Sequence, residues 1–188
     1  MGYDPSGYVN AWGILAGAAL IVAGAGCIIA SGGAATPIGA ACWVQAGVLL
    51  GVTGVITTNC AAEESVMVVD VSASAPLTNV KKGASLVIDF QDDSFDLYGH
   101  YGYTSSVGGS PITYSAGKVY NYEESGDYSE EFVNIGGSYG WIGADYCRSP
   151  DLNPSSCNAR SITFGLPGTT GAGAYVGADF FYQIYYLE

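Results

Sequence analysis

The chain has a single histidine, His100, and histidine is the side chain that most often exchanges protons near neutral pH. His100 lies in the segment Asp96-Leu97-Tyr98-Gly99-His100, whose alternation of residue types predicts a β-strand. Side chains at every second position of a strand share a face, so His100 and Asp96 are predicted to face the same way. A histidine beside a carboxylate can act as a general acid or base, which makes this pair the catalytic candidate. An ordinary strand histidine without a catalytic role is the competing interpretation.

Other acidic side chains cluster in two places. Paired carboxylates can hydrolyse glycosidic bonds, and clustered ones can hold Ca²⁺. Their positions in a predicted turn and a predicted loop favour a solvated surface instead. The sequence has no Cys/His cluster with zinc spacing and no phosphate-binding loop before a helix, so it predicts no metal and no cofactor. The clusters are Asp89, Asp92, Asp93 and Asp96, and Glu123, Glu124, Glu130 and Glu131.

Five cysteines are present, which is an odd number. Cys147 and Cys157 bracket a polar loop that contains proline, and a disulfide between them could clamp its base. Cys27 and Cys42 would face one another if the chain folded back near residue 35, which leaves Cys60 without a partner. Disulfides would indicate an oxidising compartment. Small packing residues are the alternative interpretation of Cys27 and Cys42.

The first third of the chain contains no charged residue between Asp4 and Glu63. It reads as two apolar segments, 12–30 and 38–58, joined by a short turn, and each has about the 20 residues that cross a bilayer as a helix. We therefore expect a transmembrane-type helical hairpin over residues 11–61. Small residues repeat along both segments and could let the two helices pack closely. A buried hairpin in a soluble domain is the alternative. The small residues are Gly13, Gly17 and Gly24 in the first segment, and Gly47, Gly51 and Gly54 in the second.

Residues 62–188 change to a period of two and are rich in Tyr and Gly, which favours an antiparallel all-β domain. About seven strands are expected in up-and-down order, with glycines inside several of them. Such glycines mark bends, so a small barrel or strongly curved sheet is predicted, with a β-sandwich as the alternative. The fold class is thus α+β, with a junction segment (1–10), the apolar hairpin and this acidic β-domain.

An outer-membrane type of barrel is a further possibility, because tyrosines alternate with small residues over suitable lengths. Two observations count against it. Asp89 and Asp145 would place charges within strands, and an N-terminal apolar hairpin does not suit the usual export route of such barrels.

The net charge of the protein indicates which classes of partner it can bind. The net charge is −12, and all five basic residues lie in the β-domain with nearly all the acidic ones. An acidic surface repels phosphate backbones, so no nucleic-acid partner is expected.

The segment Asp4-Pro5-Ser6-Gly7, followed directly by a Gly/Ala-rich apolar hairpin and then a further domain, resembles the junction of rearrangement-hotspot (Rhs, Tyr-Asp repeat) polymorphic toxins. In that family the junction ends a large β-shell, and the segment after it is the released effector. The resemblance implies a protein that is secreted or delivered into a target cell membrane. It also implies an Rhs shell or chaperone before release, and an immunity protein as a partner.

These observations lead to an expected function. The hairpin would insert into a lipid bilayer and permeabilise it, without covalent chemistry. One alternative is a hydrolytic toxin domain at 65–188 that the hairpin helps to translocate. Another is a membrane-anchored domain for binding or adhesion. The sequence alone does not decide whether the protein is an enzyme.

Overall fold

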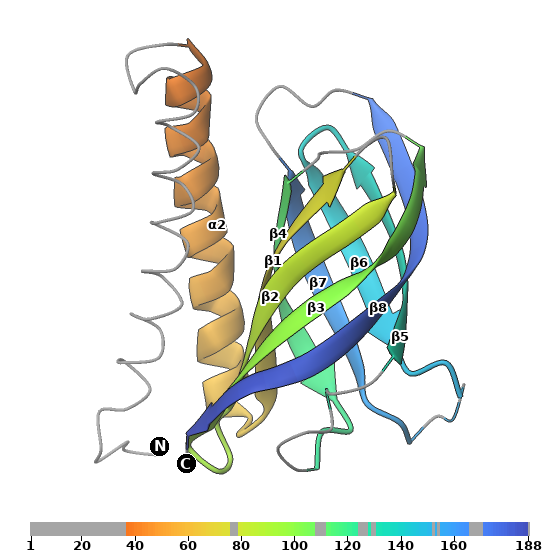
Figure 1. Cartoon of the computed structure of the whole chain (residues 1–188). Coiled ribbons are helices and arrows are strands. Elements are labelled where there is room, and N and C mark those ends of the chain that lie inside the picture. The colour runs from red at the N-terminus through yellow and green to blue at the C-terminus, as the bar shows by residue number, and fades with distance from the viewer. Residues whose placement is uncertain are drawn as a thin grey trace.

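The structure is a computed structural model, and it describes residues 37–75, 79–107, 112–123, 128, 131–151, 153, 155–165 and 171–187. Within these residues one helix runs beside a set of β-strands (Figure 1). The elements are α2 (Pro37–Ala62), β1 (Val66–Ala75), β2 (Val80–Asp89), β3 (Ser94–Val107), β4 (Ile112–Tyr120), β5 (Glu131–Tyr139), β6 (Ile142–Arg148), β7 (Asn158–Gly165) and β8 (Ala172–Leu187).

Several connections between the strands turn through left-handed backbone conformations. Asn79 lies between β1 and β2 with φ of 55°, and Asp93 lies between β2 and β3 with φ of 52°. Gly140 occupies the two-residue connection between β5 and β6 with φ of 62°. Asn, Asp and Gly are the residues that adopt this conformation at least cost, so these residue types set where the chain reverses.

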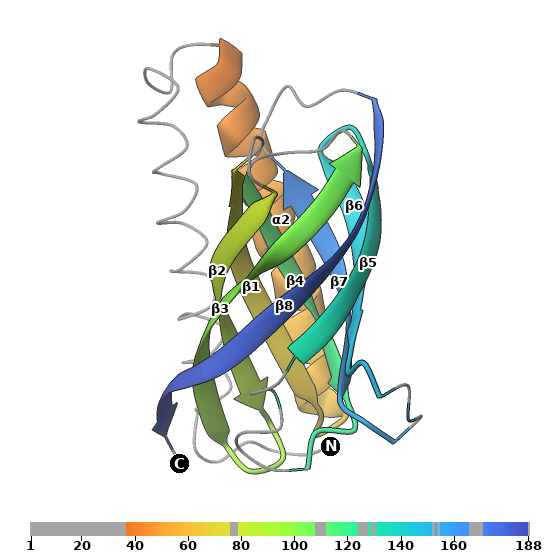
Figure 2. The same ribbon diagram turned by 45° about the vertical axis from the view of Figure 1, so that its right-hand side comes forward.

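The eight strands form a closed barrel in which every neighbouring pair is antiparallel. The order around the barrel is β1-β2-β3-β8-β5-β6-β7-β4, and β4 closes the ring by pairing with β1. Figure 2 shows β8 crossing the wall diagonally, and β8 pairs with β3 on one side and β5 on the other. Because β1 and β4 pair with one another, neither is left as an edge strand with unpaired backbone hydrogen-bonding groups.

The predicted fold class is wrong in the number of strands, in their order and in the β-sandwich given as the alternative. The prediction of a β-barrel is confirmed. The described residues form eight strands in a closed barrel, neither seven strands in up-and-down order nor a sandwich. The extra strand arises because the run from Val133 to Gly143 folds back at Gly140 and Trp141, so that Tyr139 pairs with Ile142. A simple alternation count does not detect a reversal this short.

The predicted apolar helical hairpin is not shown. Its second segment, 38–58, falls within α2, whereas its first segment lies outside the described residues, as do Gly13, Gly17, Gly24 and Cys27. Cys42 belongs to α2, but its side chain also lies outside the description. Among the described residues, no helix is both long enough and apolar enough to cross a membrane.

The predicted packing stripe is not tested, because Gly13, Gly17 and Gly24, on which the glycines of α2 would pack, lie outside the described residues. A Cβ atom built on Gly47, Gly51 or Gly54 would meet no atom within 4 Å, so this helix face is open among the described residues. The helix instead packs on the barrel through larger side chains, including Val52, Ile56 and Cys60. These contact β-strand residues such as Met67 and Ile88, both of which are fully buried.

Two clusters of buried apolar side chains therefore exist. One lies between α2 and the outer face of the barrel, and the other lies inside the barrel. Alternate residues of the same strand feed the two clusters: Val66 and Val68 of β1 point inward, and Met67 and Val69 point toward the helix.

Candidate functional site: a polar lumen inside an apolar outer surface

The lumen of the barrel is lined by many polar side chains. The register places Asp70 opposite Ser85 and Ser85 opposite Tyr98, so these side chains share the inner face of β1, β2 and β3. The same alternation brings polar residues to the inner face of the other strands. The buried polar residues on this face include Ser72, Ser85, Asp96, His100, Ser115, Asn134, Thr163 and Asp179.

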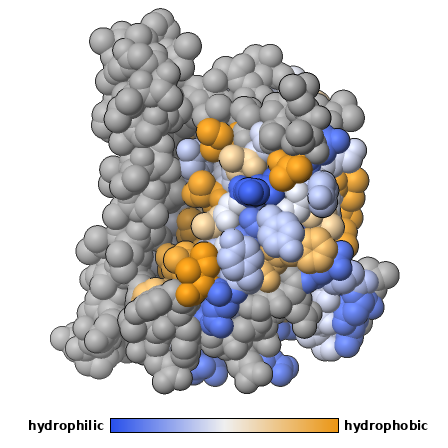
Figure 3. Space-filling model, viewed as in Figure 1, coloured by the Kyte–Doolittle hydropathy of each residue, from blue (hydrophilic) through white to orange (hydrophobic). Residues whose placement is uncertain are grey.

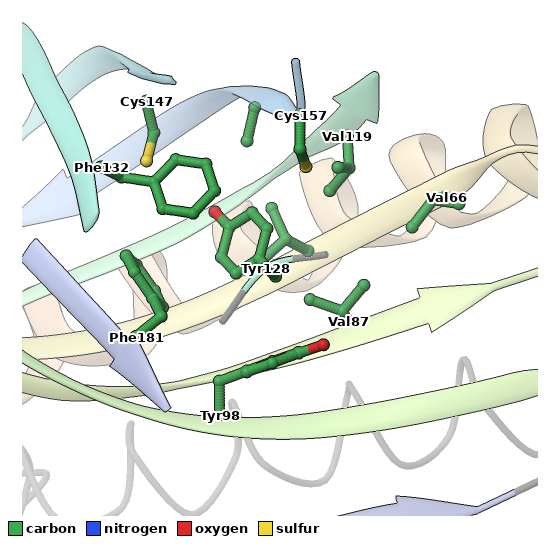
Figure 4. Close-up of a cluster of buried hydrophobic side chains, with 11 residues drawn as sticks. Val66, Val87, Tyr98, Val119, Tyr128, Phe132, Cys147, Cys157 and Phe181 are labelled. Atoms are coloured by element: carbon green, nitrogen blue, oxygen red, sulfur yellow. The ribbon is translucent and has the colours of Figure 1, made fainter. Parts of the chain in front are cut away.

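One end of the lumen is apolar and aromatic. Tyr128, from the connection between β4 and β5, lies in the middle of this cluster (Figure 4). Its ring centroid is 4.8 Å from that of Phe132, 4.7 Å from that of Phe181 and 5.6 Å from that of Tyr98. Burial raises the pKa of the Tyr128 phenol well above its usual range, so the hydroxyl stays protonated. This end is filled by side chains.

The rest of the lumen holds a chain of ionisable groups. His100 Nε2 lies 2.7 Å from Asp70 Oδ1, and the Ser85 hydroxyl donates to the same oxygen at 2.6 Å. Lys81 Nζ lies 2.7 Å from Asp179 Oδ2, which also accepts a hydrogen bond from Asn134. His100 Nδ1 is 3.9 Å from Asp179 Oδ2, so the histidine stands between two carboxylates.

Glycine makes room for these side chains. A Cβ atom at Gly83 would lie 2.2 Å from His100 Nε2, and one at Gly102 would lie 2.3 Å from Asp179 Oδ1. Backbone carbonyls are equally close, Val71 O at 2.4 Å from the Cβ position of Gly83 and Ala178 O at 2.0 Å from that of Gly102, so glycine follows from the close approach of both the backbone and the ionic groups. An eight-stranded barrel is just wide enough for its interior to be filled in this way.

The predicted catalytic pair is not brought together. Asp96 shares the inner face of β3 with His100, as expected, but it bonds to other groups: it accepts hydrogen bonds from Tyr122, from Tyr98 at 3.2 Å and from Gln183 at 2.6 Å. Burial raises the pKa of the Tyr122 phenol, and its hydrogen bond to Asp96 raises it further, so Tyr122 remains a donor.

The carboxylate partner of His100 is Asp70, thirty positions away in sequence. Sequence reasoning missed Asp70, Asp179 and Lys81 because only the register shows that they meet. A histidine held by a carboxylate resembles the base and orienter of many hydrolases. Here the His100 side chain has no exposed surface, so in this conformation it offers no base to a substrate.

The other predicted site residues have varied outcomes. Asp89 is the last residue of β2 and accepts a hydrogen bond from the backbone of Gln91 at 2.8 Å, and Asp92 and Asp93 are exposed in the turn that follows. Glu123 and Glu131 are also exposed, and Glu124 and Glu130 lie outside the described residues. Among the described residues no group of three His, Cys, Asp or Glu side chains is arranged to hold a metal ion.

Cys147 and Cys157 are both buried, and the predicted disulfide between them is not formed. The register explains why bracketing a loop did not make them partners. Cys147 lies opposite Ala159, and the backbone of Ser149 bonds to that of Cys157 at 3.4 Å. The two cysteines are therefore diagonal neighbours across the strands, and both pack in the apolar end of the lumen.

The outer surface has the opposite character from the lumen. Large apolar and aromatic side chains on strands away from α2 are exposed, and we call this set the outer belt. Along β3, β8, β5, β6 and β7 the charged outward residues are Glu131, Arg148 and Arg160, all of which lie toward one end of the barrel. The outer belt consists of Tyr101, Tyr103, Ile135, Tyr139, Ile142, Ile162, Val176, Phe180, Tyr182 and Ile184.

The two ends of the barrel differ in charge. We call the end with the β2–β3, β4–β5 and β6–β7 connections the acidic end, and Glu63, Asp92, Asp93, Glu123 and Asp151 lie there. We call the opposite end the uncharged end because its described connection residues, Asn79, Gly140, Trp141 and Gly171, carry no charge, although Lys82 is exposed on β2 close to that end. On the face drawn in Figure 3, hydrophilic side chains lie at the lower end, which is the acidic end, and also near the middle and the upper right, with apolar ones between them and along the right-hand edge.

No protein-family model matches this chain, and comparison with the curated proteins and with the solved structures likewise gives no match.

Proposed function

We propose that this barrel inserts into a lipid bilayer and that the protein is a membrane-acting effector that permeabilises its target. The observation that carries the proposal is the inside-out distribution of side chains. Charged groups occupy the lumen, as with His100 and Asp179, while residues such as Ile135 and Tyr182 are 57% and 51% exposed on the outside. Barrels that span membranes alternate in this way, with apolar residues outward and polar residues inward.

The dimensions of the barrel support the proposal. The belt strands β5, β6 and β7 have 9, 7 and 8 residues, and β3 and β8 have 14 and 16. At about 3.4 Å per residue and a tilt of about 40°, these lengths cover about 18 to 42 Å along the barrel axis. This range includes the apolar band of about 25 Å that surrounds membrane barrels. Tyr139 and Trp141 lie at the uncharged end and Tyr120 lies at the acidic end, which are the places where aromatic girdles meet lipid headgroups.

The position of each strand carboxylate removes one sequence-based objection to a membrane barrel. Asp145 hydrogen-bonds with Tyr175 and is near Lys81, so its side chain lies in the lumen. Asp89 lies at the end of its strand. Neither residue places a charge against lipid in the middle of the belt.

In this proposal the outer wall of the barrel contacts the membrane, whereas the sequence analysis assigned that contact to the helical hairpin. Because the lumen is packed with side chains, we assign permeabilisation to disturbed lipid packing around the inserted barrel. The resemblance of residues 4–7 to an Rhs junction supports release from a larger toxin into a target cell membrane. An immunity protein and an Rhs shell or chaperone would be the protein partners.

The test is a charge placed in the outer belt. Ile135→Lys puts an ammonium on an exposed site, where it should not disturb folding in water. Against lipid, Lys at the bilayer midplane costs about 2 to 4 kcal/mol, so we expect vesicle binding, measured by flotation, to fall by about thirtyfold or more. Release of an entrapped dye should fall with it.

Gln91→Lys is the matched control, because it makes the same charge change at an exposed site in the β2–β3 turn. It should bind vesicles and release dye like the unaltered protein. Equal binding by the Ile135→Lys and Gln91→Lys variants would contradict the proposal, provided that circular dichroism shows both to be folded.

A further inference from the structure

The outer surface has a hollow of about 590 Å³ where β5, β6 and β7 lie side by side. Ile135, Ala144 and Ile162 line its apolar part, and Tyr146 and Arg160 line its polar part. Asp145 and Ser161 complete the lining, at paired strand positions whose side chains belong to the inner face of the barrel. The hollow is shallow and open along the outer surface, so it could hold a ligand against the barrel wall but could not enclose it. Because Ile135 and Ile162 belong to the outer belt, the hollow is continuous with the surface assigned to lipid contact.

Arg160 brings a positive charge to the edge of this hollow. Its guanidinium lies 5.2 Å from the ring centroid of Tyr120 and 5.9 Å from that of Tyr146. These cation–π contacts hold the side chain against the barrel wall. Among the described residues Arg160 forms no salt bridge with a carboxylate, so its charge is not neutralised by a pair.

The neighbour of Arg160 on β4 is also basic. Lys118 lies directly opposite Arg160 in the register, and like charges at opposed positions destabilise a sheet. Lys118 is ion-paired with Glu63 across an exposed contact. An anion bound at Arg160 would relieve the remaining repulsion, so the local charge pattern fits an anionic ligand.

We propose that this hollow binds one anionic phospholipid, with its phosphate at Arg160 and an acyl chain along Ile135 and Ile162. The inference rests on the proposed insertion into a bilayer. Arginine suits a phosphate because its planar group can donate two parallel hydrogen bonds. The position of Arg160 in β7, third from the acidic end, places it where headgroups meet the apolar band.

The net charge of the protein allows this inference to be tested against the behaviour expected from overall electrostatics. With a formal net charge of −12, the protein as a whole should be repelled by an anionic bilayer. A preference for anionic lipid therefore requires a local site that outweighs the overall repulsion.

The experiment measures flotation of the full chain with two kinds of vesicle: phosphatidylcholine alone, and phosphatidylcholine mixed with phosphatidylglycerol. The unaltered protein should bind the mixed vesicles more tightly. Arg160→Gln should lose about fivefold in affinity for mixed vesicles, which is the effect of one basic residue at an anionic surface, and should bind neutral vesicles unchanged.

The matched control is Lys82→Gln, which removes one positive charge from an exposed site at the other end of the barrel wall. It should keep the preference for mixed vesicles. Equal losses in the Arg160→Gln and Lys82→Gln variants would overturn the lipid site while leaving membrane insertion intact. So would displacement of the protein from mixed vesicles by inorganic phosphate, since that would indicate a site for free phosphate. If the unaltered protein bound neither kind of vesicle, the proposed function would fail and this inference with it.

Discussion

Two faces of the barrel carry similar apolar side chains in different surroundings. On the face formed by β1 and β2, Met67 and Ile88 are fully buried beneath α2. On the opposite face, Ile135 and Val176 lie opposite one another on neighbouring strands and are 57% and 52% exposed. The chain supplies its own cover for the first face. The second face is apolar and has no cover among the described residues, a contrast that the proposed insertion into a bilayer would explain.

The largest effect should come from shortening a side chain on the covered face. Ile88→Ala removes methyl groups from a site with no exposure, and such changes lower the free energy of unfolding by about 2 to 5 kcal/mol. The matched change on the uncovered face, Ile135→Ala, should alter it by less than about 0.5 kcal/mol in water. Urea unfolding without lipid measures both, and a similar loss in the two variants would remove the contrast between the faces.

A smaller effect is expected at the glycines of the barrel wall. In Gly83→Ala the new Cβ atom would lie 2.2 Å from His100 Nε2 and 2.4 Å from the carbonyl oxygen of Val71, so the lumen must be strained. We expect a loss of about 1 to 3 kcal/mol in the free energy of unfolding.

Gly137 on the outer surface provides the comparison, because its nearest neighbouring atom would be 3.4 Å away. Gly137→Ala should be neutral or slightly stabilising. If the Gly83→Ala variant unfolded at the same urea concentration as the Gly137→Ala variant, the packed lumen would be contradicted and an open channel favoured.

The smallest expected change in the free energy of unfolding comes from a substitution in α2, on the side that covers the barrel. Thr53 is buried in α2, and its hydroxyl has no hydrogen-bond partner among the described residues. Thr53→Val replaces this hydroxyl with a methyl group of similar size, so the free energy of unfolding should rise by about 1 kcal/mol. Thr58→Val, at an exposed position of the same helix, serves as the control and should not stabilise. A destabilised Thr53→Val variant would mean that the interface under α2 is not apolar.

The sequence predicted the β-character of the C-terminal part and several strands, because a period of two survives in their residue types. It did not predict which face of each strand is inside. Alternation places Ile135 and Asn134 on opposite faces of the strand. It does not show whether the polar face or the apolar face points out of the barrel. That choice depends on closure of the barrel, which pairs β1 with β4 and β3 with β8.

The candidate site was predictable only in part. His100 was identified from its residue type, and the strand that carries it was expected. Its partners were not, because Asp70 and Asp179 come from strands far apart in the sequence and meet His100 only through the register. Arg160 and its two tyrosines were missed for the same reason, since Tyr120, Tyr146 and Arg160 lie on three different strands.

The place of β8 in the ring has a consequence for the time course of folding. β1, β2 and β3 form one set of sequential neighbours, and β5, β6 and β7 form another. The two sets are joined only by β4 on one side and by β8, the last described strand, on the other. Pairing between distant segments is slow to form. We therefore expect the continuous apolar wall to form late in folding, after two separate sheets whose edges stay free until β4 and β8 join them.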